Sequence, residues 1–145
     1  MGHEMNAEHE IKLMNFVEKN LGRPFVWGRC DCNVFALEVI DAVFDTALAD
    51  KIEGKYRTEK GAIKFRRRSW GSFINLLKEA GFVESQKGFE QTGDMLIVED
   101  EEWERVHVYL GNWACASFPD DGVQLFPMTV MNDKPYKVWR YICLP

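Results

Sequence analysis

Apolar residues change their spacing at Gly81, and this change constrains the fold more than any other feature of the sequence. Before Gly81 they recur every three or four residues, which is the spacing of a buried helical face. After Gly81 they form short runs of strand length that are separated by turn residues. Helices followed by strands that pair with their neighbours predict an α+β fold.

The half of the chain before Gly81 contains four candidate helices. Gly22 is placed to end the first of them, and Gly81 is placed to end the last. The third candidate is heavily charged, whereas the second is strongly apolar. The predicted helices cover residues 6–21, 32–44, 56–68 and 70–80.

The half of the chain after Gly81 contains five apolar runs of strand length. Gly111-Asn112 separates two of these runs, and a two-residue turn of this kind is typical of an antiparallel β-hairpin. The predicted strands cover residues 95–98, 106–110, 113–118, 122–126 and 136–142.

The composition is that of an ordinary globular protein, with 46% apolar and 28% charged residues. A chain of 145 residues is expected to form a single domain over 1–145, with residues 1–10 as a candidate flexible segment. The net charge of −5 argues against general nucleic-acid binding. No apolar stretch approaches the roughly 18 residues that a membrane span needs.

The N-terminus and the cysteines indicate where the chain is made. Residues 1–4 are polar and acidic, unlike a secretory signal peptide. Four cysteines in a chain of this length do not suggest a disulfide scaffold. We therefore expect synthesis in a reducing cytoplasm, without a signal peptide.

Cys32 is the candidate nucleophile. Asp31 is placed to cap the second predicted helix, so Cys32 becomes its first residue. Free N–H groups and the helix dipole stabilise a thiolate at that position, and we expect the pKa of the thiol to fall. The alternative interpretation is a small buried residue with no reactivity.

His107 is the candidate base, because a cysteine nucleophile needs an imidazole to take its proton and later to protonate the leaving amine. The other two histidines, His3 and His9, lie in the N-terminal segment and are poorer candidates. The alternative interpretation of His107 is a half-buried structural residue in a strand.

Cys30 and Cys32 form a Cys-x-Cys pair that could bind a metal together with Cys115, Cys143 or His107. Zinc sites usually space paired cysteines by two to four residues, and no second pair is present. We therefore expect no metal, and a loop position for Cys30.

The sequence also resembles a known family over roughly residues 20–141. Trp27-Gly28 followed by Asp31-Cys32 resembles the nucleophile motif of NlpC/P60 cysteine peptidases. Residues 93–98 resemble the Gly-Asp strand of that family, and residues 107–112 resemble its histidine strand. The stretches 56–58, 66–68 and 81–82 are similar to the short, phage- and prophage-encoded branch.

The resemblance implies a papain-like α+β fold, with N-terminal helices packed on a small antiparallel sheet formed by the C-terminal half. It implies a Cys32–His107 hydrolase that cleaves an amide bond in bacterial peptidoglycan stem peptides, without a cofactor. It further implies a phage tail setting, with other tail proteins as partners. The alternatives are an inactive structural or assembly component of a tail tip, and an amidase or acyltransferase with the same chemistry.

The resemblance departs from the family at two points. A strict alignment places Arg105, rather than His107, at the position of the catalytic histidine. The group that should orient the imidazole is undetermined, with Ser117, Asp120, Asp121 or a backbone carbonyl as candidates.

Three further residues are expected to support the site. Asp31 acts as a cap, Asp94 fixes a turn at the entrance of a strand, and Trp27 either lines the cleft or fills the core.

Two charged runs complete the pattern. Arg66-Arg67-Arg68 is expected to be a solvated helix face, or a surface for an acidic cell-wall polymer or a partner protein. The acidic run 99–104 is expected to form an exposed loop that borders the cleft.

Overall fold

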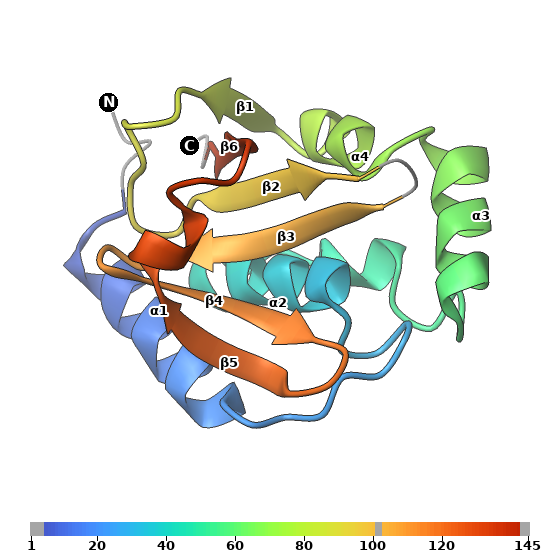
Figure 1. Cartoon of the computed structure of the whole chain (residues 1–145), viewed down its shortest axis with the longest axis horizontal. Helices are drawn as coiled ribbons and strands as arrows, with labels where there is room; N and C mark the ends of the chain where they lie inside the picture. The colour runs from blue at the N-terminus through green and yellow to red at the C-terminus, as the bar shows by residue number, and fades with distance from the viewer. Residues whose placement is uncertain (1–4, 101–102, 143–145) are drawn as a thin grey trace.

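The computed structural model describes residues 5–100 and 103–142, which form helices and one antiparallel sheet (Figure 1). The helices are α1 (Ala7–Asn20), α2 (Cys32–Phe44), α3 (Glu59–Ser69) and α4 (Phe73–Glu79), with the short 3-10 turns η1 (Ala49–Lys51) and η2 (Met128–Met131). The strands are β1 (Phe82–Ser85), β2 (Met95–Glu99), β3 (Glu104–Tyr109), β4 (Trp113–Phe118), β5 (Gly122–Pro127) and β6 (Tyr136–Tyr141). The predicted α+β class is confirmed.

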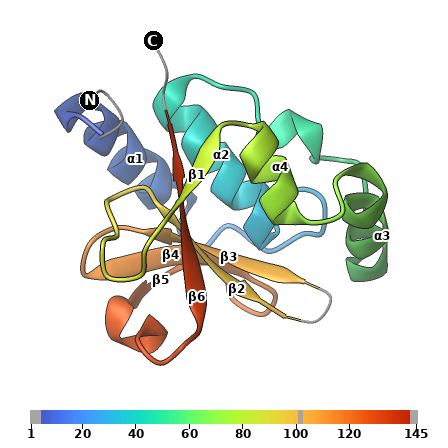
Figure 2. The ribbon, with the colours of Figure 1, turned by 90° about the horizontal axis from the view of Figure 1, so that it is seen from above.

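The sheet has six strands in the order β1-β6-β2-β3-β4-β5, and every neighbouring pair is antiparallel. The last strand, β6, therefore lies between β1 and β2. It pairs the end of the C-terminal half with the beginning of that half. Figure 2 shows α1, α2 and α4 on one face of this sheet. The helices of the first half thus pack on a sheet built by the second half.

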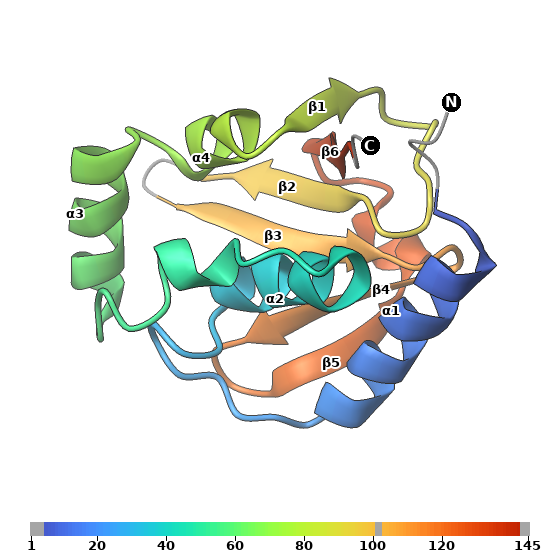
Figure 3. The ribbon, with the colours of Figure 1, turned by 180° about the vertical axis from the view of Figure 1, so that it is seen from behind.

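Helix α2 is the centre of the core. It packs against α1 and against the sheet, where it contacts β3 and β4 (Figure 3). Because it is covered on both sides, its apolar residues extend around most of the helix rather than along one stripe. Its fully buried apolar side chains are Val34, Phe35, Ala36, Leu37, Val39, Ile40 and Val43. A smaller cluster lies apart from this core and contains Leu96, Met131, Tyr136 and Val138.

The predicted helices and strands are present, with boundaries that their caps explain. The third helix begins at Glu59 rather than at residue 56, because the Thr58 hydroxyl accepts a bond from the N–H of Gly61. Ser72 caps α4 in the same way, so this helix begins at Phe73 rather than at residue 70. Strand β1 was not predicted, because it is a four-residue edge strand with a single buried apolar residue.

The β3–β4 hairpin has the predicted turn, but its two strands pair only next to that turn. The N–H of Leu110 donates to the carbonyl of Trp113 at 2.8 Å, which closes the two-residue turn. The ladder continues through the pairs Tyr109–Ala114 and Val108–Cys115 and ends there, although both strands extend further. Figure 1 shows the two strands separating beyond this point.

Candidate active site

The start of α2 is held by one buried carboxylate. Asp31 accepts bonds from the N–H of Val34 and the N–H of Gly28, both at 2.9 Å, and from the Tyr56 hydroxyl at 2.7 Å. The predicted N-cap is therefore present, and it also fixes the loop before the helix. That loop passes so close to residue 56 that a Cβ on Gly28 would lie 1.9 Å from the Tyr56 carbonyl oxygen.

Cys32 is the first residue of α2, as predicted, and its side chain is only 7% exposed. The thiol points at the carbonyl oxygen of Glu104, 3.9 Å away, and the Asn33 amide lies 3.8 Å from the sulfur. Burial raises the pKa of the thiol to about 12, and the charge of Asp31 adds to this increase.

The expected fall in the pKa of the Cys32 thiol is therefore wrong. Hydrogen bonds from Val106 and Trp103 and the charge of Arg66 lower the pKa, but they do not offset burial beside the capping carboxylate. The thiol is protonated at neutral pH.

His107 occupies a strand position that alternates with Val106 and Val108, which belong to the core against α2. Its ring instead contacts those of Phe118 and Phe126, with centroids 6.3 and 5.7 Å away. Since successive side chains on a strand point to opposite faces, His107 lies on the face of the sheet away from α2.

The carbonyl of Leu96 orients His107. The Nδ1 atom lies 3.0 Å from this oxygen. Because a carbonyl only accepts hydrogen bonds, Nδ1 carries the proton and Nε2 is left with its lone pair. Burial lowers the pKa of the imidazole, and the bond to Leu96 only partly opposes this. The ring is therefore neutral at pH 7, with Nε2 available to accept a proton.

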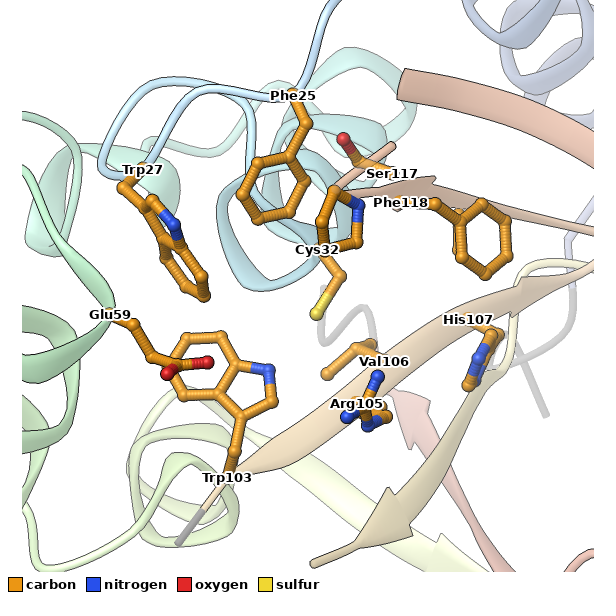
Figure 4. Close-up of a pocket in the computed structure, with 12 residues that line it drawn as sticks. Phe25, Trp27, Cys32, Glu59, Trp103, Arg105, Val106, His107, Ser117 and Phe118 are labelled. Atoms are coloured by element: carbon orange, nitrogen blue, oxygen red, sulfur yellow. The ribbon is translucent and has the colours of Figure 1, made fainter. Parts of the chain in front are cut away.

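Cys32 and His107 line one pocket, at the place where β3 and β4 separate (Figure 4). The sulfur of Cys32 points into the pocket toward Val106, and His107 lies beyond Val106 on the same strand. The hydrogen bonds of the two side chains go to different partners, and none joins them within residues 5–100 and 103–142. Both predicted residues thus line the pocket, but no hydrogen bond joins them.

One wall of the pocket is aromatic. The ring of Trp27 packs edge-on against Trp103 at 5.1 Å and against Phe25 at 4.8 Å. Of the two roles considered for Trp27, lining the cleft and filling the core, the structure therefore shows the first. Glu59 and Arg105 also line the pocket and give it one carboxylate and one guanidinium. Arg105 donates from Nε to Asp100 at 2.9 Å.

Glu104 connects the pocket to α3 and α4. Its carboxylate accepts from Arg66 at 2.5 Å and from the N–H of Ile74 at 3.1 Å, while its backbone carbonyl accepts from the Asn33 amide at 3.2 Å. The guanidinium of Arg66 also lies 3.8 Å from the centre of the Trp103 ring.

Two predictions for the charged runs are therefore corrected. Arg66 is buried rather than solvated, because it lies one helical turn from the buried Ala62. Glu104 is buried in β3 rather than exposed in a loop, and Glu99 belongs to β2. Residues 101 and 102 lie outside the described part of the chain.

The remaining candidates for the group that orients His107 have other roles. Ser117 lines the pocket, but its hydroxyl donates to the Cys30 carbonyl at 2.7 Å and lies 3.6 Å from the Cys30 sulfur. Asp120 and Asp121 are exposed beyond the end of β4 and do not line the pocket. The backbone carbonyl, which the sequence left as one of four options, is the group in contact with His107.

Asp94 lies away from this pocket. It accepts from Arg140 at 2.9 and 2.8 Å and from the N–H of Gln91 at 2.8 Å, which holds the turn before β2. Its role is thus to fix the strand, as the sequence suggested.

A metal site is not formed by the described residues. No group of three or more His, Cys, Asp or Glu side chains lies close enough to hold an ion in residues 5–100 and 103–142. Cys143, one of the ligands considered, lies outside these ranges. Among the same residues no helix is long and apolar enough to cross a membrane.

The comparisons with known proteins give the family of the chain. Residues 5–140 match the family described as "Domain of unknown function (DUF6950)", and the chain belongs to this family. Among solved structures it is similar to the P60 domain of the M. avium subspecies paratuberculosis antigen MAP1204, with 15% identity and a TM-score of 0.49. The alignment covers 94% of this chain and 96% of the other. No curated protein matches the chain.

Proposed function

We propose that this protein is a cysteine hydrolase that cleaves an amide bond in the stem peptides of bacterial peptidoglycan. Cys32 is the nucleophile and His107 is the base. The observation that supports the proposal is the shared pocket, because Cys32 at the start of α2 and His107 with an unprotonated Nε2 both line it although they lie far apart in the sequence.

The proposed reaction starts from a neutral pair, because the thiol is protonated and the imidazole is neutral. The thiol proton moves to Nε2 of His107 as the sulfur attacks the amide carbonyl, with the backbone N–H of Cys32 as an oxyanion donor. The C–N bond then breaks, the imidazolium protonates the leaving amine, and water hydrolyses the thioester. This sequence requires Nε2 to approach the sulfur when substrate binds, since no bond joins them in the free protein.

The setting that we propose is a phage or prophage tail, where the enzyme opens the cell wall locally and contacts other tail proteins. This part of the proposal is supported by the resemblance of the sequence to the phage-encoded branch of NlpC/P60 peptidases. It is independent of the chemistry at Cys32.

A second candidate function is a catalytically inactive component of a tail tip that binds the wall through the same pocket. The position of Val106 favours it, because Val106 rather than His107 is the β3 side chain that packs toward α2 beside Cys32. The high pKa of the thiol is also what an unreactive cysteine would show.

Digestion of purified peptidoglycan separates the two candidates. The wild-type protein, Cys32→Ala and His107→Ala are incubated with it, and released fragments are identified by mass spectrometry. The matched control is Cys115→Ala, which removes a buried thiol outside the pocket. We expect fragments from the wild type and the control, and a loss of about a hundredfold or more in both site variants. Equal release from wild type and Cys32→Ala would contradict the hydrolase, and sedimentation with peptidoglycan without cleavage would support the inactive component.

A further inference from the structure

The outer face of α3 and the loop before it carry cations that form no ion pair with the described residues. In the segment 55–68, seven side chains are Lys or Arg and one is Glu, which gives a net charge of +6 in a chain of net charge −5. Six of the seven are exposed and make no hydrogen bond or ion pair with the described residues. These six residues, here called the cationic face, are Lys55, Arg57, Lys60, Lys64, Arg67 and Arg68.

Three carboxylates that share a hollow with α3 side chains already have partners. The carboxylates at the facing ends of β2 and β3 each bind a cation outside the cationic face. Glu99, Asp100 and Glu104 pair with Lys137, Arg105 and Arg66, respectively, at 3.0, 2.9 and 2.5 Å. Within residues 5–100 and 103–142, no carboxylate forms an ion pair with the cationic face, which leaves these cations open to an external anion.

The stability of α3 does not explain these charges. Arg67 and Arg68 lie in the last turn, where the helix dipole favours cations. Lys60 lies in the first turn, where the dipole disfavours them. Lys60 and Lys64, and again Lys64 and Arg68, are like charges four residues apart, which costs about 0.2–0.5 kcal/mol for each pair. Charges that weaken their own helix point to an external ligand.

We infer that the cationic face binds a linear phosphodiester polymer of the bacterial cell wall, of the poly(glycerol phosphate) type. Lys60, Lys64 and Arg68 follow one line along α3, and the helical rise separates successive members by about 6 Å. Such a row suits an extended chain with regularly repeated charges. The choice of a wall polymer rests on the proposed function.

Two observations favour this occupant over a nucleic acid. The aromatic side chains of α3 and its C-cap, Phe65 and Trp70, are only partly exposed and pack on each other at 5.6 Å, so they do not form a platform for stacked bases. In addition, α3 begins at Glu59, which lines the pocket of Cys32. A polymer bound along α3 therefore reaches a residue that lines the pocket.

Binding is measured with the full chain carrying Cys32→Ala, so that the result is independent of hydrolysis. The probes are poly(glycerol phosphate), single-stranded DNA and poly-glutamate, each titrated at several salt concentrations. The test variant is Lys60→Gln/Lys64→Gln/Arg68→Gln. The matched control is Lys19→Gln/Lys78→Gln/Lys134→Gln, which removes three exposed cations elsewhere on the surface.

We expect poly(glycerol phosphate) to bind more tightly than the other two probes. The test variant should lose about tenfold or more in affinity, and the slope of log Kd against log salt should fall by about two, because each phosphate contact contributes about 0.7. The control variant should bind as the parent does. Equal losses in both triple variants, no binding by the parent, or tighter binding of DNA or poly-glutamate would overturn the inference. None of these outcomes changes the peptidoglycan digestion result.

Discussion

The Tyr56 hydroxyl donates a hydrogen bond of 2.7 Å to the carboxylate of Asp31, the residue that caps α2 immediately before Cys32. The loop before α3 is thereby tied to the start of the helix that carries the thiol. The bond also keeps a negative charge buried next to the sulfur, and this charge is the second largest cause of the raised pKa of Cys32.

Replacing Asp31 with Asn should make Cys32 more reactive. The substitution removes the charge that helps to raise the pKa of the thiol, so a larger fraction is thiolate at any pH below that value. We expect alkylation of Cys32 by iodoacetamide at pH 9 to be severalfold faster than in the wild type. Peptide mass spectrometry distinguishes Cys32 from the other cysteines.

The control for this prediction is Asp94→Asn, which alters a buried carboxylate away from the pocket. It should leave the alkylation rate of Cys32 unchanged. A folded Asp31→Asn protein with the wild-type rate would show that the carboxylate does not govern the thiol.

Gly28→Ala should prevent folding of the region around Cys32. Gly28 has φ +80°, and its added Cβ would lie 1.9 Å from a backbone oxygen that cannot move aside cheaply. Gly81→Ala is the matched control, because Gly81 has φ +100° but nothing within 4 Å of the added Cβ. We expect Gly81→Ala to lower the free energy of unfolding by only about 1–2 kcal/mol, the cost of backbone strain alone. Urea denaturation measures both, and similar losses would refute the steric argument.

Arg66 and Glu104 should be strongly coupled, since their ion pair is almost fully buried. Arg66→Met and Glu104→Gln each leave a partner without its counter-charge, and each should lower the free energy of unfolding by about 3–5 kcal/mol. The double variant should be destabilised by clearly less than the sum of the two. A double-mutant cycle from urea denaturation measures this coupling, and strictly additive losses would exclude it.

His107 should make the protein less stable in mild acid. Its folded-state pKa is lowered by burial, so the unfolded chain binds a proton at a higher pH than the folded chain does. The free energy of unfolding should therefore decrease as the pH falls below about 6.5, the ordinary value for histidine, toward the folded-state pKa. In His107→Leu this decrease should be smaller. Titration of the His107 ring by NMR provides a second measurement, and a midpoint at or above 6.5 would contradict the sign.

The sequence predicted the elements whose signals are local. Asp31 and the residues after it have the pattern of a capped, buried helix, and the structure forms α2 over the predicted residues. Gly111-Asn112 has the pattern of a two-residue turn, and the hairpin closes there. Strand β1 could not be predicted in this way, because it is held by pairing with β6 rather than by its own pattern.

The site was less predictable, because its properties depend on distant contacts. The position of Cys32 follows from the local sequence, but its pKa depends on what covers it, and this cover comes from β3. The inward direction of Arg66 depends on Glu104, which lies far along the chain. Every residue type has a backbone carbonyl, so the residue type at position 96 does not indicate that its carbonyl contacts His107. The group that orients His107 could therefore not be chosen from the sequence.

The two-residue turn between β3 and β4 restricts how the length of this chain can vary. Side chains on a strand alternate between faces, so a one-residue change that the turn did not absorb would reverse β4, turning Ser117 away from Cys30 and Phe118 toward α2. A longer turn has to hold the extra residue in a bulge or a wider loop. Related chains that conserve the pocket should therefore vary in length at this turn without changing which face each β4 residue lies on.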